Sequence, residues 1–159
     1  MSNSLDTKQS GQRRAARGDR ALDHGLLPRL VGYQLRLAQL AVFPDFDRAT
    51  ADLGLPPGRF GMLVLIEANP GVTQSALARA VGLDRSTMVA LLDQLEDRRL
   101  VARRQGEDRR TNGLWLTARG RALLAKMKRR VAAHEARVAA RLTNAERELL
   151  LGALRRLGE

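Results

Sequence analysis

The chain has 159 residues, and its 28 lysine and arginine residues against 17 aspartate and glutamate residues give a formal net charge of +11. This length suits one domain with, at most, a dimerisation extension, and the charge favours a polyanionic partner. The absence of cysteine excludes disulfides, thiolate metal sites and thiol-based redox sensing. With only two histidines and no nucleophile at motif spacing from either, we expect neither an enzyme nor a metal or cofactor.

No apolar run approaches the roughly 20 residues of a membrane span, and the N-terminal stretch lacks the apolar segment of a secretory signal. We therefore expect a cytoplasmic protein with no membrane partner. Residues 1–22 hold few large apolar side chains, so the sequence predicts a disordered basic arm there. Such an arm could add affinity for phosphate, but a solvated tail is the alternative, because Asp6 and Asp19 dilute its charge.

The first helix is predicted to begin at Leu26, with Pro28 tolerated in its first turn, and to stop near Pro44. Residues 45–52 can form one or two further turns before a loop rich in proline and glycine. A largely buried helix follows from about Gly58 to Ala68.

Two short helices are predicted next, because Thr73 and Asp84 each stand as an N-cap before apolar residues at helical spacing. Gly82 lies between them and can adopt the positive φ of a sharp turn. This order is typical of a helix-turn-helix, whose second helix reads the major groove. The apolar stripe of that second helix consists of Met88, Leu91, Leu92 and Leu95. Its opposite face carries Arg85, Ser86, Thr87, Ala90 and Gln94.

A β-hairpin is predicted after the two helices. Residues 100–104 and 113–116 have strand character, and the polar loop between them contains Gly106 and a basic tip. A helix-turn-helix followed by such a hairpin is a winged helix, whose loop can insert arginine into a minor groove. We expect Trp115 to lie in the core and to hold the wing against the helices.

Two helices are predicted at the C-terminal end. Thr117 caps a long one that runs to about Arg141, and Thr143 with Glu146 forms a capping box for the last. Both carry more apolar surface than a small reading domain can cover, so the sequence predicts a symmetric dimer. The long helix has a narrow seam of the kind that pairs helices, formed by Leu124, Met127, Val131, His134 and Val138.

The predicted fold is mainly α with a small β-wing, in the order α-α-α-α-β-β-α-α. We divide the chain into a basic arm (1–22), an N-terminal dimerisation helix and loop (23–57), a winged helix-turn-helix (58–117) and C-terminal dimerisation helices (118–159).

Two segments, LARAVGLDRSTMVALLDQLEDRRLVAR and GEDRRTNGLWLTARG, carry a family resemblance. Over about residues 26–157 the chain resembles the MarR family of bacterial transcriptional regulators. The resemblance implies a homodimer held by its first, fifth and sixth helices, with two winged reading heads that usually repress a nearby operon. It also implies that a small aromatic acid, a phenol or a related compound releases the protein from DNA.

The resemblance further implies which residues meet DNA. Asp108 would orient the wing through a salt bridge, while Arg110 and Arg109 enter the minor groove. Ala90 departs from the pattern, since many relatives carry an arginine there, and Arg85 is the candidate to supply that guanidinium. The complete predicted DNA-binding set is Thr73, Gln74, Arg85, Ser86, Thr87, Gln94, Asp108, Arg109 and Arg110. About half of Arg103, Arg104, Arg119 and Arg121 are expected to touch phosphate.

An effector site is suggested by aromatic residues on the first two helices, which line the ligand cavity in relatives. Nearby arginines, Arg48 among them, could pair with a carboxylate or with the phosphates of a coenzyme A thioester. The alternative is ordinary core packing for each aromatic residue and solvation for each arginine. The candidate effector residues are Tyr33, Arg36, Phe43, Phe46, Arg59 and Phe60.

The leading hypothesis is a dimeric, sequence-specific regulator, acting as a repressor, with two partners: an inverted-repeat operator in double-stranded DNA and a small effector. The effector would be an aromatic acid, a phenolic compound or an aromatic acyl-CoA. The half-sites of the operator should lie about 10 base pairs apart. Two alternatives remain: a low-specificity architectural DNA-binding protein, and a winged-helix module that binds an acidic protein partner.

Overall fold

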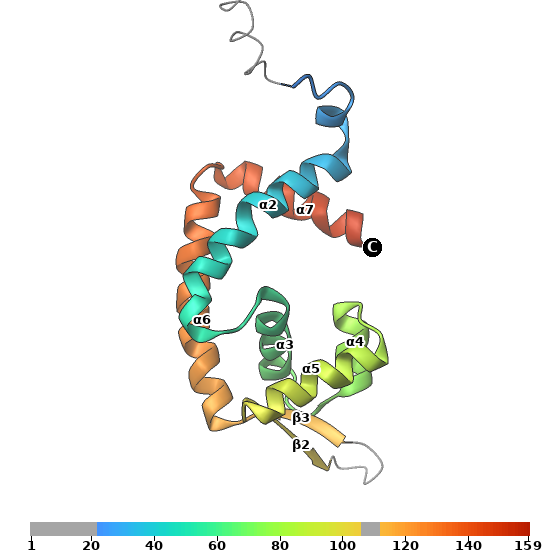
Figure 1. Cartoon of the computed structure of the whole chain (residues 1–159), viewed down its shortest axis with the longest axis vertical. Coiled ribbons are helices and arrows are strands. Elements are labelled where there is room, and N and C mark those ends of the chain that lie inside the picture. The colour runs from blue at the N-terminus through green and yellow to red at the C-terminus, as the bar shows by residue number, and fades with distance from the viewer. Residues whose placement is uncertain (1–21, 106–111) are drawn as a thin grey trace, which may run out of the picture. The chain divides into compact units, whose positions relative to one another are not determined.

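The computed structural model describes residues 22–105 and 112–159. It is mainly helical with one small antiparallel sheet, which confirms the predicted fold class (Figure 1). The chain divides into two compact units, Met1–Ala38 and Gln39–Glu159, with the boundary inside helix α2 (Val31–Thr50). Across the described ranges, none of the helices combines the length and the apolar character that a bilayer-spanning segment needs.

The described part of the first unit contains the 3-10 turn η2 (Leu27–Arg29) and the beginning of α2. Pro28 lies at the start of η2, where its missing N–H is not needed. The Gln34 side-chain amide donates to the Pro28 carbonyl oxygen over 2.8 Å, so the turn and the helix start are fastened together.

Helix α2 contains Pro44, so the prediction that this helix stops near Pro44 was wrong. A proline in a helix removes one backbone hydrogen bond and costs roughly 3 kcal/mol. The residues after it compensate through tertiary contacts, because Phe46 and Thr50 are buried and Asp45 bonds to His134 on helix α6 (Ala118–Ala139). The Thr50 hydroxyl also donates to the Phe46 carbonyl oxygen at 2.9 Å. Tertiary packing of these residues therefore outweighs the tendency of Pro44 to end the helix.

The core lies between helices α3 (Pro57–Ala68), α4 (Gln74–Val81) and α5 (Arg85–Asp97), the sheet and α6 (Ala118–Ala139). The short turn η3 (Ala51–Leu53) is fastened to the end of α5, since the Arg98 guanidinium donates to the carbonyl oxygens of Gly54 and Leu53. Fully buried side chains of this core include Leu63, Ile66, Leu77, Met88, Leu92, Leu95, Leu124 and Met127.

The sheet has the strand order β1-β3-β2, with all neighbours antiparallel. Strands β2 (Val101–Gln105) and β3 (Asn112–Leu116) are the predicted wing strands, whereas β1 (Val72–Thr73) was not predicted. Two residues are too few to show an alternating pattern. Trp115 on β3 is half-buried rather than in the core, and its ring covers Gly71 and Gly113.

Helix α6 begins after its N-cap Thr117, whose hydroxyl accepts from the Gly120 N–H at 2.9 Å. A Cβ on Gly120 would lie 2.0 Å from the Leu100 carbonyl oxygen, so only glycine allows α6 to start this close to β2. The predicted seam of α6 packs within its own chain, because Leu124, Met127 and His134 are buried there. It is therefore not a free pairing surface.

Helix α7 (Asn144–Gly158) follows the predicted capping box of Thr143 and Glu146. It buries no residue within its own chain. Its exposed apolar side chains are Leu149, Leu150, Leu151, Leu154 and Leu157.

Candidate nucleic-acid interface

The front of helix α5 is organised by Asp84. Its carboxylate caps the helix by accepting from the Thr87 N–H at 2.9 Å, and it also accepts from the hydroxyls of Ser86 and Thr87. These hydrogen bonds hold the pKa of Asp84 well below its ordinary value. Because both hydroxyl protons point to Asp84, the outward-facing oxygens of Ser86 and Thr87 are left as hydrogen-bond acceptors. Such acceptors suit the amino groups of adenine or cytosine better than phosphate oxygens.

Arg85 is the first residue of α5, and its side chain is exposed. In the described part of the chain its guanidinium has no hydrogen-bond or ion-pair partner, so all five of its donors are available to a ligand. Beside it lies a cavity of about 300 Å³ where α4, α5 and the wing strands meet. The lining residues are Thr73, Gln74, Ser75, Arg85, Arg103, Asn112 and Leu114.

The start of helix α4 also lines this cavity. Thr73 caps α4 by accepting from the Ala76 N–H at 3.2 Å, and Gln74 is the first helical residue. The first turn of a helix presents backbone N–H groups and a partial positive charge, which favour an anion. The structure thus places Thr73, Gln74 and Arg85 of the predicted DNA-binding set around one cavity. Ser75 and Asn112 line the same cavity and were not in the predicted set; Asn112 lies next to Gly113, which pairs with Thr73 of the unpredicted strand β1.

Two of the basic residues near the wing have structural roles. Arg103 on β2 forms ion pairs with Asp93, at 2.8 Å, and with Glu96 on α5, and its backbone N–H donates to Glu96 at 3.0 Å. Arg121 donates to the Leu116 carbonyl oxygen at 2.8 Å. These contacts fasten the wing to the helices. Asp108, Arg109 and Arg110 at the predicted wing tip lie outside the described residues.

Gln94, the last of the predicted reading residues, lies on the exposed side of α5. Its amide oxygen accepts a hydrogen bond from the guanidinium of Arg59 on α3. Arg59 belongs to the predicted effector set, so one residue from each predicted site meets here.

Residues 53–111 match the sequence model of the MarR family. Over 138 residues the chain is 41% identical to a putative transcriptional regulatory protein for the hcr operon of Thauera aromatica, covering 86% of this chain and 83% of that relative. The chain belongs to the MarR family. This membership confirms the resemblance found in the reading helix and the wing.

Solved structures of the transcriptional repressor CouR are similar to this MarR-family chain. CouR bound to a 23-mer DNA duplex has a TM-score of 0.84 and 42% identity, covering 88% of this chain and 100% of that one. CouR bound to p-coumaroyl-CoA has a TM-score of 0.80 and 40% identity, covering 87% of this chain and 99% of that one. The MarR-family chain is therefore a winged-helix transcriptional regulator.

The predicted effector residues of this MarR-family regulator lie in different surroundings. In the first unit, the Tyr33 hydroxyl lies 3.1 Å from His24 Nδ1, and Arg36 is exposed. In the second unit, Phe43 is 43% exposed, whereas Phe46 is buried. The Phe46 ring packs 6.2 Å from the half-buried Phe60 ring and 5.6 Å, edge-on, from the His134 ring, measured between centroids. Phe46 and Phe60 thus contact each other, as core residues do.

Proposed function

We propose that this protein is a homodimeric repressor in the cytoplasm that binds an inverted-repeat operator and is released from it by a small effector. Helix α5 enters the major groove, and the start of α4 meets the phosphate backbone. The observation that carries the proposal is Arg85, which stands exposed and unpaired at the front of α5, beside the α4 terminus, among the described residues. A bidentate arginine contact to guanine is the commonest specific contact in the major groove.

The wing completes the proposed DNA-binding surface. Asp108 orients it, and Arg109 and Arg110 reach the minor groove, as the family resemblance implies. The similarity of 42% identity to CouR bound to a DNA duplex supports the same docking in this chain.

Dimerisation is supported by the exposed leucines of α7. Leu149 is 74% exposed and Leu157 is 61% exposed, which is unfavourable for side chains of this type in water. A second copy of the chain would cover them and would place two reading heads on one operator.

The effector in this proposal is an aromatic acid, a phenolic compound or an aromatic acyl-CoA. The CouR complex with p-coumaroyl-CoA, at 40% identity over 87% of this chain, supports the last of these classes. Aromatic residues of α2 and α3, with Arg59, are the candidates for contact with its aromatic part.

Footprinting on the DNA upstream of the gene tests the proposal. We expect two protected half-sites about one helical turn apart, and loss of protection when p-coumaroyl-CoA or p-coumarate is added. Competition with random duplex separates the repressor from the architectural alternative, for which operator and random DNA would compete equally. Absence of any protected site at moderate salt would contradict the proposal.

A further inference from the structure

A cavity of about 370 Å³ lies between the second half of α2 and the end of α6, away from the reading helix. Three arginines contribute to its wall: Arg48 from α2, Arg137 from α6, and Arg141, which follows the end of α6. None of its seven lining residues is aromatic, and the apolar ones are Ala41, Val42 and Val138. The chemistry of the wall is therefore suited to a charged group rather than to an aromatic ring.

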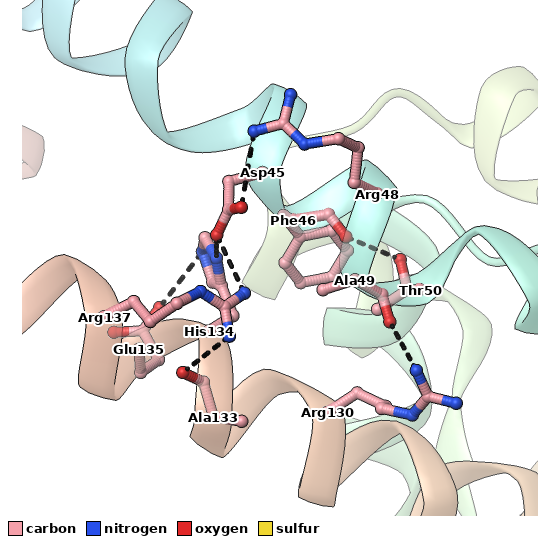
Figure 2. Close-up of polar contacts among 10 residues, drawn as sticks. All are labelled: Asp45, Phe46, Arg48, Ala49, Thr50, Arg130, Ala133, His134, Glu135 and Arg137. Carbon is pink, nitrogen blue, oxygen red and sulfur yellow. Dashed lines mark hydrogen bonds and ion pairs between the residues drawn. The ribbon is translucent and has the colours of Figure 1, made fainter.

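Asp45 organises this wall, as Figure 2 shows. One of its carboxylate oxygens accepts from Arg137 at 2.9 Å and lies 2.8 Å from Nδ1 of His134, which is 1% exposed. The other oxygen accepts from Arg48 at 3.4 Å. Asp45 thus joins both helices and fixes two guanidinium groups at the cavity.

The pocket nevertheless keeps an excess of positive charge. Three arginines against one aspartate leave a net charge of +2, without counting His134. Arg141 is exposed and has no hydrogen-bond or ion-pair partner within residues 22–105 and 112–159, so its donors are unused. Guanidinium groups bind phosphate in a bidentate manner, and a doubly charged phosphate matches this excess.

The size of the cavity sets a limit on what it can hold. Ligand pockets span roughly 300–1,000 Å³, and about 370 Å³ is at the small end of that range. One phosphate group with an adjoining sugar fits such a space, whereas a complete aromatic thioester of coenzyme A does not.

We propose that the pocket of Arg48, Arg137 and Arg141 binds a phosphate group of the effector. This inference rests on the proposed ligand-controlled function and narrows it, because it selects a phosphorylated aromatic acyl thioester over a free aromatic acid. Arg141 supplies the contact that is unused in the unliganded chain, and Asp45 is a positioning residue that keeps Arg48 and Arg137 in place.

Isothermal titration calorimetry of the full chain with adenosine 3′,5′-bisphosphate, the phosphate-bearing end of coenzyme A, tests the pocket directly. We expect binding to the wild type, weakened about tenfold or more by Arg141→Ala, because one charge-assisted contact is lost. Arg129→Ala is the matched control: it removes the same charge from an exposed position of α6 that does not line the cavity. Arg48→Ala, on α2, is a second variant and should weaken binding as well.

Several outcomes would overturn the inference. They are no binding of the bisphosphate, equal affinity in the Arg141→Ala and Arg129→Ala variants, or displacement of the bisphosphate by p-coumarate alone. Sedimentation of Arg141→Ala must also show an unchanged oligomeric state, since a weaker dimer would make the pocket a subunit contact instead. Release of operator DNA is measured separately with p-coumaroyl-CoA, so a wild type that binds the bisphosphate but keeps its DNA when p-coumaroyl-CoA is added would refute the proposed control and not the pocket.

Discussion

The guanidinium of Arg59 on α3 donates a hydrogen bond to the side-chain oxygen of Gln94 on α5, which joins a predicted effector residue to a predicted reading residue. Within residues 22–105 and 112–159, Nε of Arg59 is buried without a hydrogen-bond partner, and Gln94 is the only side chain that accepts from this guanidinium. A ligand that offered Arg59 a carboxylate or phosphate would compete with Gln94 for the same donors.

This relationship predicts an energetic coupling between the two residues. Replacing Gln94→Met should lower the free energy of unfolding by about 1–2 kcal/mol, because a partly buried guanidinium then loses its acceptor. Arg59→Met, which removes the donor and keeps much of the packing, should cost less. Urea unfolding of both single variants and the double variant measures the coupling, and additive effects would show that the contact contributes nothing.

The exposed position of Arg85 predicts a large effect on DNA binding without an effect on folding. Arg85→Ala should weaken operator binding by about 1–3 kcal/mol, the usual value of a good base contact, and leave the unfolding transition unchanged. Arg155→Ala on α7 removes the same charge from an exposed helix and serves as the control. Mobility-shift titration at fixed salt compares them, and equal losses would mean that Arg85 acts only through net charge.

The hydrogen bonds of Asp45 predict that the free energy of unfolding depends on pH. Hydrogen bonds from His134 and Arg137 lower the pKa of Asp45 from 3.8 to about 2. Between these values the unfolded chain binds more protons than the folded one, so this contribution to stability is complete above about pH 4 and disappears as the pH falls to 2. Urea unfolding across this range should give a shallower slope for Asp45→Asn than for the wild type. Asp84 and Glu146, whose pKa values are also lowered, should contribute to the slope that remains.

Two glycines in helices should respond to alanine in opposite ways. Gly120→Ala places a Cβ 2.0 Å from the Leu100 carbonyl oxygen, and the backbone shift should cost about 2–3 kcal/mol of unfolding free energy. Gly61→Ala in α3 meets no atom within 4 Å and should stabilise the protein by up to about 1 kcal/mol. Thermal unfolding of the two variants checks this, and a tolerated Gly120→Ala would contradict the close approach.

Local signals in the sequence were sufficient to predict where four of the helices begin. Thr73, Asp84, Thr117 and Thr143 all cap the helices predicted to follow them, because a cap depends on residues only three positions apart. Pro44 is the counterexample, since distant packing extends the helix through it.

The candidate sites depend more on distant contacts. Thr73, Gln74 and Arg85 could be placed together because the helix-turn-helix is a local motif. Asp45 and Arg137, by contrast, are 92 positions apart, and nothing in either segment alone indicates that they meet. The pocket of Arg141 could not be predicted from the sequence either, because it forms only when α6 lies along α2.

The absence of space between Gly120 and the Leu100 carbonyl oxygen fixes how far the start of α6 stands from the wing. The start of α6 cannot move closer to the residue before β2 without a steric clash. Towards its other end the same helix is held by Arg137, which donates to Asp45 on α2. Helix α6 thus links the wing to α2, with a close backbone contact at one end and a charged hydrogen bond at the other, so Gly120→Ala and Asp45→Asn perturb opposite ends of one rod-like element.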